Sequence, residues 1–588
     1  MNPRTPPVLH RALRVFAFGA LFFSEIPTRA MQAAPAVSGS LETILQTSLA
    51  GYTSAAAGVG ARGTRMASWE PTAPSAPTQN RLVLIAGMDE PVPKAVPQNA
   101  AAPSTLAALQ FLQWWTTPDA ASARALWQVV ILPAAYPEGP KTEPPVFPPL
   151  KGFFNHPTDV ESRSLWRWSA MSAPDLVVDL RISERPARAA NALAKTLFPD
   201  ASDAAAPELV AALGTGTPSG LPPVPALRLE DRPEHVQETL RTLVSKPIPH
   251  SALRTALEKR AARDPLAIAR ALAARYPAAP GMSYIPALAW TGALRVSRLT
   301  GDPVFRDKAV AQMQGFLTGE KPAIGATPNL PSLAGHLAFS DWAQAEGRSD
   351  AGALALSAAQ RLLPSADAPN TVPHGSRWTD DLFMACAVLA RAANATGDSQ
   401  YADAAERILI SYAKRLQRPD GIFVHVESSP FAWGRGNGFA AFGLMEALTH
   451  LPPNRPERAA LLEIFRKQMQ GLLAHQSPDG SWRQVIDEPG AYREFTATAM
   501  LTTALARGIR LGWIERETFL PAVERGWRAV SVRIAEDASL VDVCTGTGAK
   551  KDCDLSYYLQ REALFGADDR GGAMALTAAL EILELRGP

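Results

Sequence analysis

Two adjacent carboxylates stand close to an indole in the phrase HGSRWTDDLFM, which covers residues 374–384. The carboxylates are Asp380 and Asp381, and Trp378 stands two residues before the first of them. A carboxyl group can act as general acid and general base, and the indole offers a flat stacking surface beside it. One of the two aspartates is expected to cap the helix that begins at Leu382, which leaves the other for chemistry.

Three further phrases carry residue types that suit a sugar-binding site. Aromatic rings can stack on the C–H faces of sugars, and polar side chains can form directional hydrogen bonds to hydroxyls and carboxylates. Arg435 can form a forked pair with a carboxylate, and the glycines around it allow close backbone approach. Taken singly, His425 could be a structural histidine and Trp433 a core residue, so the prediction depends on their joint occurrence. The phrases are PDGIFVH (419–425), FAWGRGNGF (431–439) and SPDGSW (477–482), the last followed by YREFTATAM (492–500).

These phrases lie in a region whose pattern predicts helices almost throughout. From about residue 250 onward, Ala/Leu-rich amphipathic stretches alternate with short turns, and a turn-then-helix phrase recurs with a period of roughly 50 residues. Gly-Asp turns can end one helix and cap the next. About five to seven such hairpins could close into a ring of inner and outer helices. A closed ring is favoured over an open solenoid because the chemistry-bearing phrases recur at one end of the units. The turn-then-helix phrases cover residues 299–313, 345–363, 395–409 and 451–465.

The first part of the chain has a different pattern. The chain of 588 residues is too long for one ordinary core, so two or more domains are expected. Three strand-like apolar runs alternate with helical stretches, which predicts a smaller, non-catalytic α/β domain with a mainly parallel sheet over residues 81–225. We expect a flexible lead-in over 35–80 and an all-α barrel over 226–588. The strand-like runs cover 81–87, 127–133 and 175–180, and LPPVP at 221–225 is expected to be a linker.

The N-terminal segment has the features of a secretory signal peptide. Three arginines precede the apolar run Val15–Phe23, and small residues follow around Ala30 and Ala34. This pattern predicts a signal peptide over residues 1–34 and a periplasmic or secreted protein. No later stretch is long and apolar enough to span a bilayer, so no integral membrane segment is expected after processing.

Charge and cysteine content narrow the function classes. The chain has 58 basic and 56 acidic residues, a net charge of +2, which gives no general attraction to nucleic acid. The three cysteines lack zinc-site spacing, so no metal site is predicted. Cys544 and Cys553 could close a small loop in an oxidising compartment or remain free thiols, and the sequence leaves this open.

Residues from about 280 to the end resemble the unsaturated rhamnogalacturonyl hydrolases of glycoside hydrolase family 105, which are related to family 88. The resemblance implies a multidomain protein with a C-terminal all-α (α/α)6 barrel, preceded here by the α/β domain. It also implies a glycoside hydrolase that needs no cofactor and acts on an oligosaccharide. The oligomeric state stays open. The phrases that carry the resemblance are WTDDLFM (378–384), GIFVH (421–425), WGRGNGF (433–439), REFTATAM (493–500), CTGTG (544–548) and DLSYYLQRE with DDRGGAMAL (554–576).

Carried over residue by residue, the resemblance assigns a role to each candidate. Asp380 matches the general acid/base of the family, with Asp381 as second choice because two adjacent carboxylates blur the match. Candidate substrate contacts are Trp378, His425, Trp433, Arg435, Asn437 and Glu494.

One segment departs from the family pattern. The family places a second carboxylate where this chain has TPNLPSLAGHLAF (327–339), and no Asp or Glu occurs there. Asn329, Ser332 and His336 occupy the segment, and the next acid is Asp341. The departure leaves open whether full activity is retained or the substrate differs.

The resemblance implies hydration rather than displacement. The expected substrates are lyase products of the pectin or rhamnogalacturonan type, whose terminal uronic acid carries a C4=C5 double bond. Asp380 would protonate C4, water would add at C5, and the hemiketal would open to release the neighbouring sugar. The alternatives are another helical-barrel sugar enzyme, either a lyase or an epimerase, and a non-catalytic glycan-binding barrel.

The N-terminal part resembles, more weakly, zinc carboxypeptidase-like (M14) domains. The matching stretches are RLVLIAGMDE, LPAAYPEG and the run from Phe153 to Arg181. The first zinc motif of that family needs a His and a Glu after the first strand, and the stretch that follows Gly87 has no His. We therefore expect a non-catalytic domain.

Overall fold

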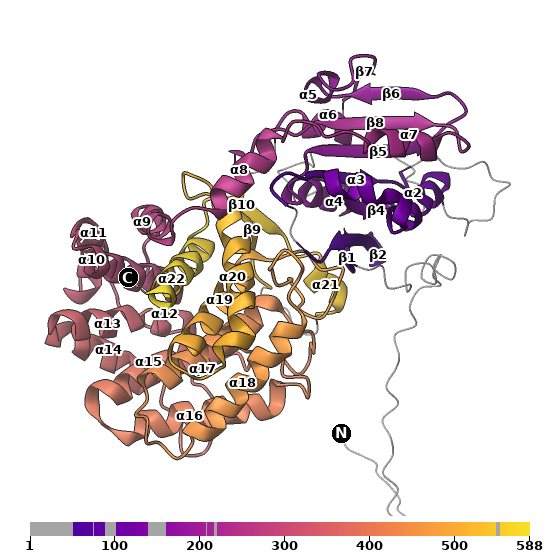
Figure 1. Cartoon of the computed structure of the whole chain (residues 1–588). Coiled ribbons are helices and arrows are strands. Elements are labelled where there is room, and N and C mark those ends of the chain that lie inside the picture. Colours follow the sequence, from indigo (N-terminus) through magenta and orange to yellow (C-terminus); the bar gives the residue numbers. More distant parts are fainter. Residues whose placement is uncertain are drawn as a thin grey trace, which may run out of the picture.

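The computed structural model describes residues 51–73, 76–88, 102–138, 147, 160–206, 208–216, 220–547 and 553–587. The predicted signal peptide lies outside the described residues and stays a prediction, as does the first part of the expected lead-in. The described chain forms an α/β domain beside a larger helical domain (Figure 1). In these residues no helix is long and apolar enough to cross a membrane.

The α/β domain is built on one mixed eight-stranded sheet in the order β1-β2-β4-β3-β5-β8-β6-β7. Its centre is parallel: β3 pairs in parallel with β4 and β5, and β5 with β8. This confirms the three predicted strands and their parallel arrangement. The strands are β1 (Tyr52–Val59), β2 (Arg65–Pro71), β3 (Asn80–Ile85), β4 (Trp127–Leu132), β5 (Leu176–Ile182), β6 (Ala187–Ala190), β7 (Ser202–Asp203) and β8 (Ala226–Asp231).

Helices cover both faces of this sheet. The predicted helix before β4 is confirmed as α2 (Pro103–Trp115), which begins with proline at its first position. The other helices of the domain are α3 (Ala121–Leu126), α4 (Val160–Met171), α5 (Ala192–Lys195), α6 (Leu209–Leu213) and α7 (Val236–Leu243).

Two predicted boundaries of this domain are wrong. The lead-in expected over 35–80 contains the antiparallel hairpin β1–β2 in its described part. Ala, Ser and Gly have little intrinsic preference for strands, but β1 is buried against α4, and this packing decides its conformation. The expected linker at 221–225 leads directly into β8, a strand of the sheet, so the domain extends beyond residue 225.

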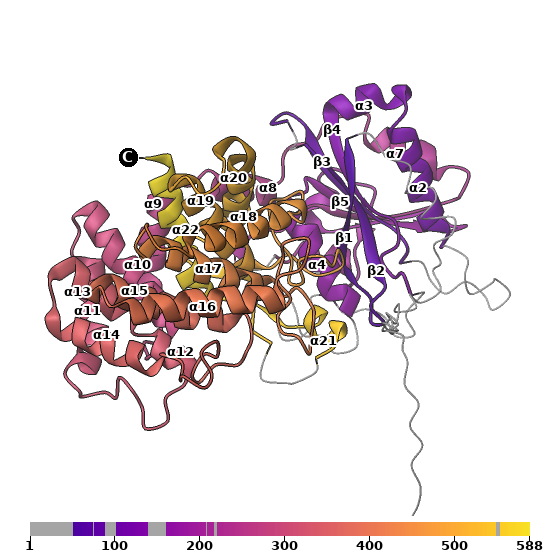
Figure 2. The same cartoon turned by 90° about the horizontal axis from the view of Figure 1, so that it is seen from below.

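The helical domain is a closed ring of six inner and six outer helices. Each inner helix packs on the next, and α22 packs on α10 to close the ring, which confirms the (α/α)6 barrel over the open solenoid (Figures 1 and 2). The inner layer is α10 (Tyr284–Thr300), the consecutive pair α12 (Leu330–Ala334) and α13 (Leu337–Glu346), α15 (Asp380–Thr396), α17 (Gly434–His450), α19 (Phe495–Arg510) and α22 (Asp569–Arg586). The outer layer is α9 (Pro265–Arg275), α11 (Val304–Leu317), α14 (Ser349–Arg361), α16 (Ser399–Leu416), α18 (Arg458–Ala474) and α20 (Arg516–Val532).

The inner helices are apolar on nearly all sides because helices surround them. In α17 every residue from Gly434 to Leu448 is buried. Gly443 allows α17 to approach α15 closely, since a Cβ there would lie 2.4 Å from the carbonyl oxygen of Leu382. Small residues at such contacts therefore set the spacing of the inner ring.

Short and long connections alternate around the ring. The predicted Gly turns end inner helices: Gly301, Gly347 and Gly397 adopt φ values of 68–71°, the left-handed conformation that favours glycine. The return connections, from an outer helix to the next inner helix, are longer and meet at the end where the inner helices begin. We call this end the mouth. The long connections cover 318–329, 362–379, 417–433, 475–494 and 533–568, the last including β9 (Leu540–Cys544), α21 (Leu555–Leu559) and β10 (Ala563–Gly566).

Below the mouth, each inner helix contributes one charged side chain to a ring of alternating sign, which we call the charge belt. Its ion pairs measure 2.5–3.0 Å, and Thr291 on α10 closes the ring by donating to Asp341 at 2.9 Å. Because each charge of the belt has at least one oppositely charged neighbour, the polar groups are paired inside an apolar barrel. In order the belt is Asp341, Arg391, Glu446, Arg507, Glu581 and Arg295.

The α/β domain is held beside the mouth by buried ion pairs. Glu70 on β2 pairs with Arg493 at 2.6 Å, and Arg167 on α4 lies 3.9 Å from Asp542 on β9. Helix α8 (Ala252–Ala261) connects the two domains and packs against α20. Since Arg493 and Asp542 both belong to long connections at the mouth, the α/β domain lies beside it.

Candidate active site

Two predicted site residues, Asp380 and Arg435, lie at the mouth because they begin inner helices, and two residues that were not predicted begin inner helices at the same end. Asp380 is the first residue of α15, Arg435 is the second of α17, and Arg570 is the second of α22. Tyr284 is the first residue of α10. The amino ends of helices carry partial positive charge, so their convergence favours an anionic ligand at the mouth.

Asp380 is the one partly exposed carboxylate of the predicted pair and lies at the start of a three-residue contact chain. Its side chain is 18% exposed, and Oδ2 lies 3.3 Å from Nε2 of His425. Nδ1 of His425 lies 2.7 Å from the hydroxyl of Tyr558 on α21. His425 and Tyr558 are each 2% exposed. The candidate proton donor Asp380 therefore contacts one buried polar residue, His425, which in turn contacts a second, Tyr558.

The ring of His425 lies between two indoles. Its centroid is 4.9 Å from that of Trp378 and 4.7 Å from that of Trp433, and the guanidinium of Arg435 lies 4.8 Å from the Trp433 ring centroid. Trp433 is only 2% exposed, so it packs beneath His425 and Arg435 and has no free face for a sugar. Its predicted role as a substrate contact is therefore not supported, whereas the half-buried Trp378 keeps an accessible surface.

Gly436 is required by the close packing at this point. A Cβ there would lie 2.7 Å from Oγ1 of Thr379 and 3.5 Å from Cδ2 of His425. The backbone N–H of Thr379 also donates to the carbonyl of His425 at 3.1 Å. The connections before α15 and α17 are thereby joined directly beside Asp380.

Asp381 has a structural role. It is fully buried, and its carboxylate accepts hydrogen bonds from the backbone N–H groups of Ser376 and Arg377 at 2.9 and 2.7 Å and from the hydroxyl of Tyr412 at 2.7 Å. Burial raises the pKa of Asp381, and these hydrogen bonds oppose the rise. Arg377 has a φ of 68°, so Asp381 stabilises a strained turn that presents Trp378 and Asp380. Asp380 is therefore the better candidate of the pair.

Asn437 and Glu494, both predicted as substrate contacts, are used within the protein. The amide of Asn437 bonds both backbone groups of Phe423 at 2.8 Å and the carbonyl of Trp433 at 3.1 Å. Glu494 is the N-cap of α19 and also accepts from the backbone N–H of Cys544 at 2.9 Å. Both side chains are fully buried. They hold the mouth connections in place, and their predicted contact with substrate is not supported.

The segment that lacks the family's second carboxylate is folded as α12. Asn329 and Ser332 form a capping box at its start, so both side chains are occupied. His336 is fully buried, and burial lowers its pKa to about 4, which leaves it neutral at neutral pH. Asp341 belongs to the charge belt, where it pairs with Arg391. No carboxylate of residues 327–341 therefore faces the mouth.

The loop that follows β9 gathers three arginines. Arg435 donates to the carbonyl of Cys544 at 2.7 Å, and Arg570 donates to the same oxygen at 3.1 Å. Arg561 donates to the carbonyl of Gly546. These groups come from three separate segments and bring positive charge together at this loop.

The helical domain that carries this site is similar to known proteins. The family model described as Glycosyl Hydrolase Family 88 matches residues 272–586, which is more than half of the chain. The chain belongs to glycosyl hydrolase family 88. This confirms the family relationship predicted from the phrases at the mouth.

Several family 88 relatives and one solved structure give the extent of the similarity. The chain is 30% identical over 172 residues to an unsaturated 3S-rhamnoglycuronyl hydrolase of Alteromonas sp. (strain LOR), covering 27% of this chain and 42% of that protein. It is 24% identical over 217 residues to the unsaturated rhamnogalacturonyl hydrolase YesR of Bacillus subtilis (strain 168), covering 36% and 60%. A glycoside hydrolase from family 105 of C. acetobutylicum ATCC 824 aligns with a TM-score of 0.48 at 21% identity, covering 54% of this chain and 98% of that one. The chain thus spans about half the length of the curated relatives it matches.

Sequence reasoning about this family 88 site missed three residues: Tyr558, Arg570 and Tyr284. Tyr558 and Arg570 occur in phrases that carried the resemblance, but no spacing rule connects them with Asp380, since they stand 178 and 190 positions after it. Tyr284 is buried, which raises its pKa, and it lies within electrostatic reach of Arg435 and Asp380. The sequence signal that could have identified these three residues is an aromatic or basic residue at the start of an inner helix or in the last long connection.

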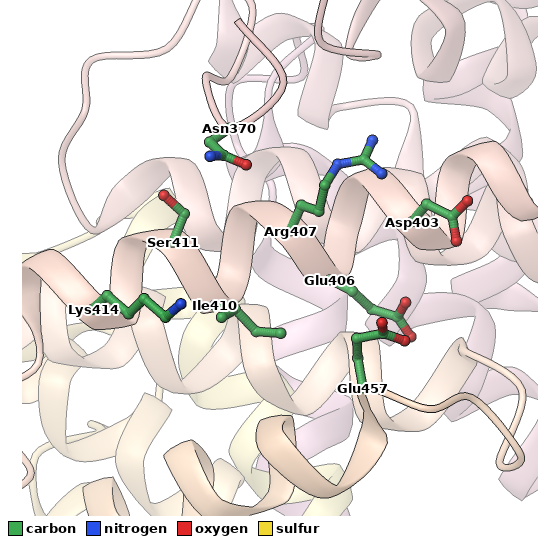
Figure 3. Close-up of a pocket in the computed structure, with 8 residues that line it drawn as sticks. All are labelled: Asn370, Asp403, Glu406, Arg407, Ile410, Ser411, Lys414 and Glu457. Atoms are coloured by element: carbon green, nitrogen blue, oxygen red, sulfur yellow. The ribbon is translucent and has the colours of Figure 1, made fainter.

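The cysteines, a surface pocket and the possible metal ligands complete the description of this family 88 chain. Cys544 is a buried free thiol, so the bridge to Cys553 left open by the sequence is absent. A pocket of about 420 Å³ follows one face of the outer helix α16, and none of the predicted site residues lines it (Figure 3). Within the described residues, no cluster of three or more His, Cys, Asp or Glu side chains could hold a metal ion.

Proposed function

We propose that this protein is a hydrolase that removes a 4,5-unsaturated uronic acid from the non-reducing end of lyase-generated oligosaccharides by hydrating the double bond. The observation that carries the proposal is the position of Asp380 at the mouth, in contact with His425 and close to Arg435. Membership in family 88 supports a glycoside hydrolase.

The arrangement of bonds in the substrate suits catalysis by one carboxyl group that acts first as an acid and then as a base. The C4=C5 bond is an enol ether, because C5 also carries the ring oxygen. Protonated Asp380 gives its proton to C4, and positive charge then develops at C5 and the ring oxygen. Water adds at C5 and returns a proton to the carboxylate. The product is a hemiketal, which opens and releases the neighbouring sugar.

This chemistry does not require two carboxylates at a fixed separation, as ordinary glycosidases do. The absence of a second carboxylate from residues 327–339 is therefore compatible with activity. The half-buried Trp378 offers an accessible surface for stacking, while Trp433, Asn437 and Glu494 hold the surrounding connections in place. Residues at the ends of rigid inner helices keep the proton donor in a fixed geometry.

His425 can serve both protonation states of Asp380. When Asp380 is protonated, its O–H donates to Nε2, and Nδ1–H donates to the oxygen of Tyr558. When Asp380 is ionised, Nε2–H donates to the carboxylate, and Nδ1 accepts from the hydroxyl of Tyr558. Each order satisfies both contacts, since neutral imidazole has one donor and one acceptor.

The sugar next to the unsaturated uronate is proposed to be rhamnose, as in pectin and rhamnogalacturonan fragments. The names of two relatives support this choice: one is an unsaturated rhamnogalacturonyl hydrolase and the other an unsaturated 3S-rhamnoglycuronyl hydrolase. The first experiment is a screen of lyase-treated polysaccharides, which follows the ultraviolet absorbance of the conjugated double bond. Loss of absorbance with release of a shorter saccharide supports the proposal. A rise in absorbance on untreated polysaccharide would identify a lyase, and binding without any change would identify a glycan-binding barrel.

A further inference from the structure

Two guanidinium groups share one backbone oxygen at the mouth. Nη1 of Arg435 and Nη1 of Arg570 both donate to the carbonyl of Cys544, at 2.7 and 3.1 Å. Because both nitrogens lie within 3.1 Å of the same atom, the two positive charges are close neighbours and repel each other. Gly546 has a φ of 113° and keeps the loop thin between them, since a Cβ there would lie 3.2 Å from Nη2 of Arg435 and 3.7 Å from Nη1 of Arg570.

The neighbouring carboxylates offset this positive charge only in part, because each of them is also committed to backbone N–H groups. Glu494 is committed to the N-cap of α19 and to the N–H of Cys544. Asp568 caps α22 by accepting from Gly571, and its Oδ2 lies 3.7 Å from Nη2 of Arg570, beyond hydrogen-bond distance.

Arg435 also has an unused donor. Its side chain is 3% exposed, and its Nε has no hydrogen-bond partner. An unpaired donor on a buried charged group is costly unless a ligand completes it. Arg570 is more accessible, with 23% of its side chain exposed. The pair therefore consists of one buried guanidinium, Arg435, and one accessible guanidinium, Arg570. A site that binds an anion from the mouth requires this arrangement.

We propose that Arg570 and Arg435 together bind the carboxylate of the unsaturated uronate, and that Arg570 determines the preference for an acidic terminal sugar. This inference rests on the proposed function. In the substrate the carboxylate carbon is bonded to C5, and C5 is bonded to C4, the carbon that Asp380 protonates. The anion site must therefore lie close to Asp380. Arg435 meets this condition, since its guanidinium lies 4.8 Å from the centroid of the Trp433 ring, and that ring lies 4.7 Å from the ring of His425, whose Nε2 is 3.3 Å from Asp380. Arg570 shares the carbonyl of Cys544 with Arg435.

A sulfate ester on the neighbouring sugar offers the same oxyanion chemistry. The position beside Asp380 favours the carboxylate, because a sulfate on the next sugar lies across the glycosidic bond from C5. The experiment therefore separates the two sources with substrates that differ in one group at a time.

The test compares Arg570→Gln with wild type on three unsaturated disaccharides: the free acid, its methyl ester and the free acid with a sulfate on the second sugar. We expect KM for both free acids to rise by about 10- to 100-fold, because charge-assisted hydrogen bonds are lost. We expect KM for the methyl ester to change by less than about threefold, because the ester carries no charge for Arg570 to pair with. Arg586→Gln is the matched control, since Arg586 ends the same helix and pairs with Glu524 on the surface. Its kinetics should equal those of wild type.

Equal losses on the acid and the ester would overturn the inference, and so would a loss confined to the sulfated substrate, which would assign Arg570 to sulfate. If Arg570→Gln unfolds at a lower temperature, Arg570→Lys replaces it. This variant keeps the charge without the fork, so KM for the free acids should rise while a preference for acid over ester remains. Equal losses on the acid and the ester would again overturn the inference.

Failure of the proposed function is recognised separately. If wild type turns over none of the three disaccharides, the hydrolase proposal fails. Calorimetric titration with the free-acid disaccharide then tests the anion site alone. A tenfold or greater loss of affinity in Arg570→Gln supports the site, and equal affinities overturn it.

Discussion

Replacing Tyr558 by phenylalanine removes one hydroxyl group and keeps the ring that packs against His425. The two rings meet edge to face, with centroids 5.8 Å apart, so the packing should survive. The hydroxyl both donates and accepts, and it serves His425 in each of its two neutral tautomers. Phenylalanine can do neither. The substitution therefore disturbs the group that holds Asp380 without touching the substrate.

The expected loss follows from the geometry of the deleted contact. It is a 2.7 Å hydrogen bond between two side chains that are each 2% exposed. Leaving a buried partner unsatisfied costs about 1–3 kcal/mol, and each 1.36 kcal/mol of barrier corresponds to a tenfold change in rate. We therefore expect kcat to fall by about 5- to 150-fold. KM should stay nearly constant, since Tyr558 lies behind His425.

The assay follows loss of the conjugated double bond for wild type, Tyr558→Phe and a control, Tyr401→Phe. Tyr401 is a buried tyrosine of the outer helix α16, and its variant should match wild type. A full pH profile of kcat separates positioning from stability, because a merely structural loss lowers the melting temperature and leaves the profile unchanged. The reasoning is refuted if Tyr558→Phe keeps the wild-type kcat and pH profile.

The remaining predictions concern packing and acid stability. Gly436→Ala should lower kcat at least about tenfold, because the added methyl group would lie 2.7 Å from Oγ1 of Thr379 and 3.2 Å from the ring of Trp433 and must displace them. Gly352→Ala, whose Cβ would make only an ordinary 3.5 Å contact, should be silent in the same kinetic assay. In the charge belt burial opposes ionisation, but Arg391 and Arg507 hold the pKa of Glu446 well below its usual range. A carboxyl with a lowered pKa stabilises the fold above its unfolded pKa of about 4.3, and this contribution is lost as the pH falls further. Melting temperatures measured from pH 7 downward should therefore drop steeply below about pH 4.3 in wild type and less steeply in Glu446→Gln, which should start about 3–5 kcal/mol less stable at pH 7. Parallel curves for the two proteins would contradict this account of the belt.

Much of the fold could be predicted from periodicity. The Gly turns at 301, 347 and 397 ended helices as expected, because a left-handed residue is needed there and the following segment is amphipathic. The apolar runs around β3, β4 and β5 were recognisable because strands buried on both faces are apolar throughout. The strands β1, β2, β6, β7 and β8 of the sheet were missed. Their residues have weak or mixed strand preference, and packing on α4 for β1 and pairing with β8 for β6 decide their conformation.

The candidate site could be predicted only in part. Asp380, His425 and Arg435 were recognised because each belongs to a phrase with several functional residue types, and the structure brings them together. The predicted contacts of Trp433, Asn437 and Glu494 with substrate are not supported. A polar or aromatic residue at a helix start serves a cap or a neighbouring ring as readily as a ligand, and composition alone does not separate these uses. The position of Tyr558 depends on how the last long connection packs against His425, and that of Arg570 on how α22 meets the loop after β9. Local spacing encodes neither.

The central claim is that Asp380 hands a proton to C4 of the unsaturated sugar. The most direct measurement is single-turnover kinetics of Asp380→Asn on an oligosaccharide that wild type cleaves, with the melting temperature recorded alongside. Loss of general acid/base catalysis predicts a rate at least about 10³-fold lower, with a melting temperature near that of wild type, because the side chain is partly exposed and has one long contact to His425. A variant that folds and still consumes the double bond at a rate near that of wild type would contradict the account.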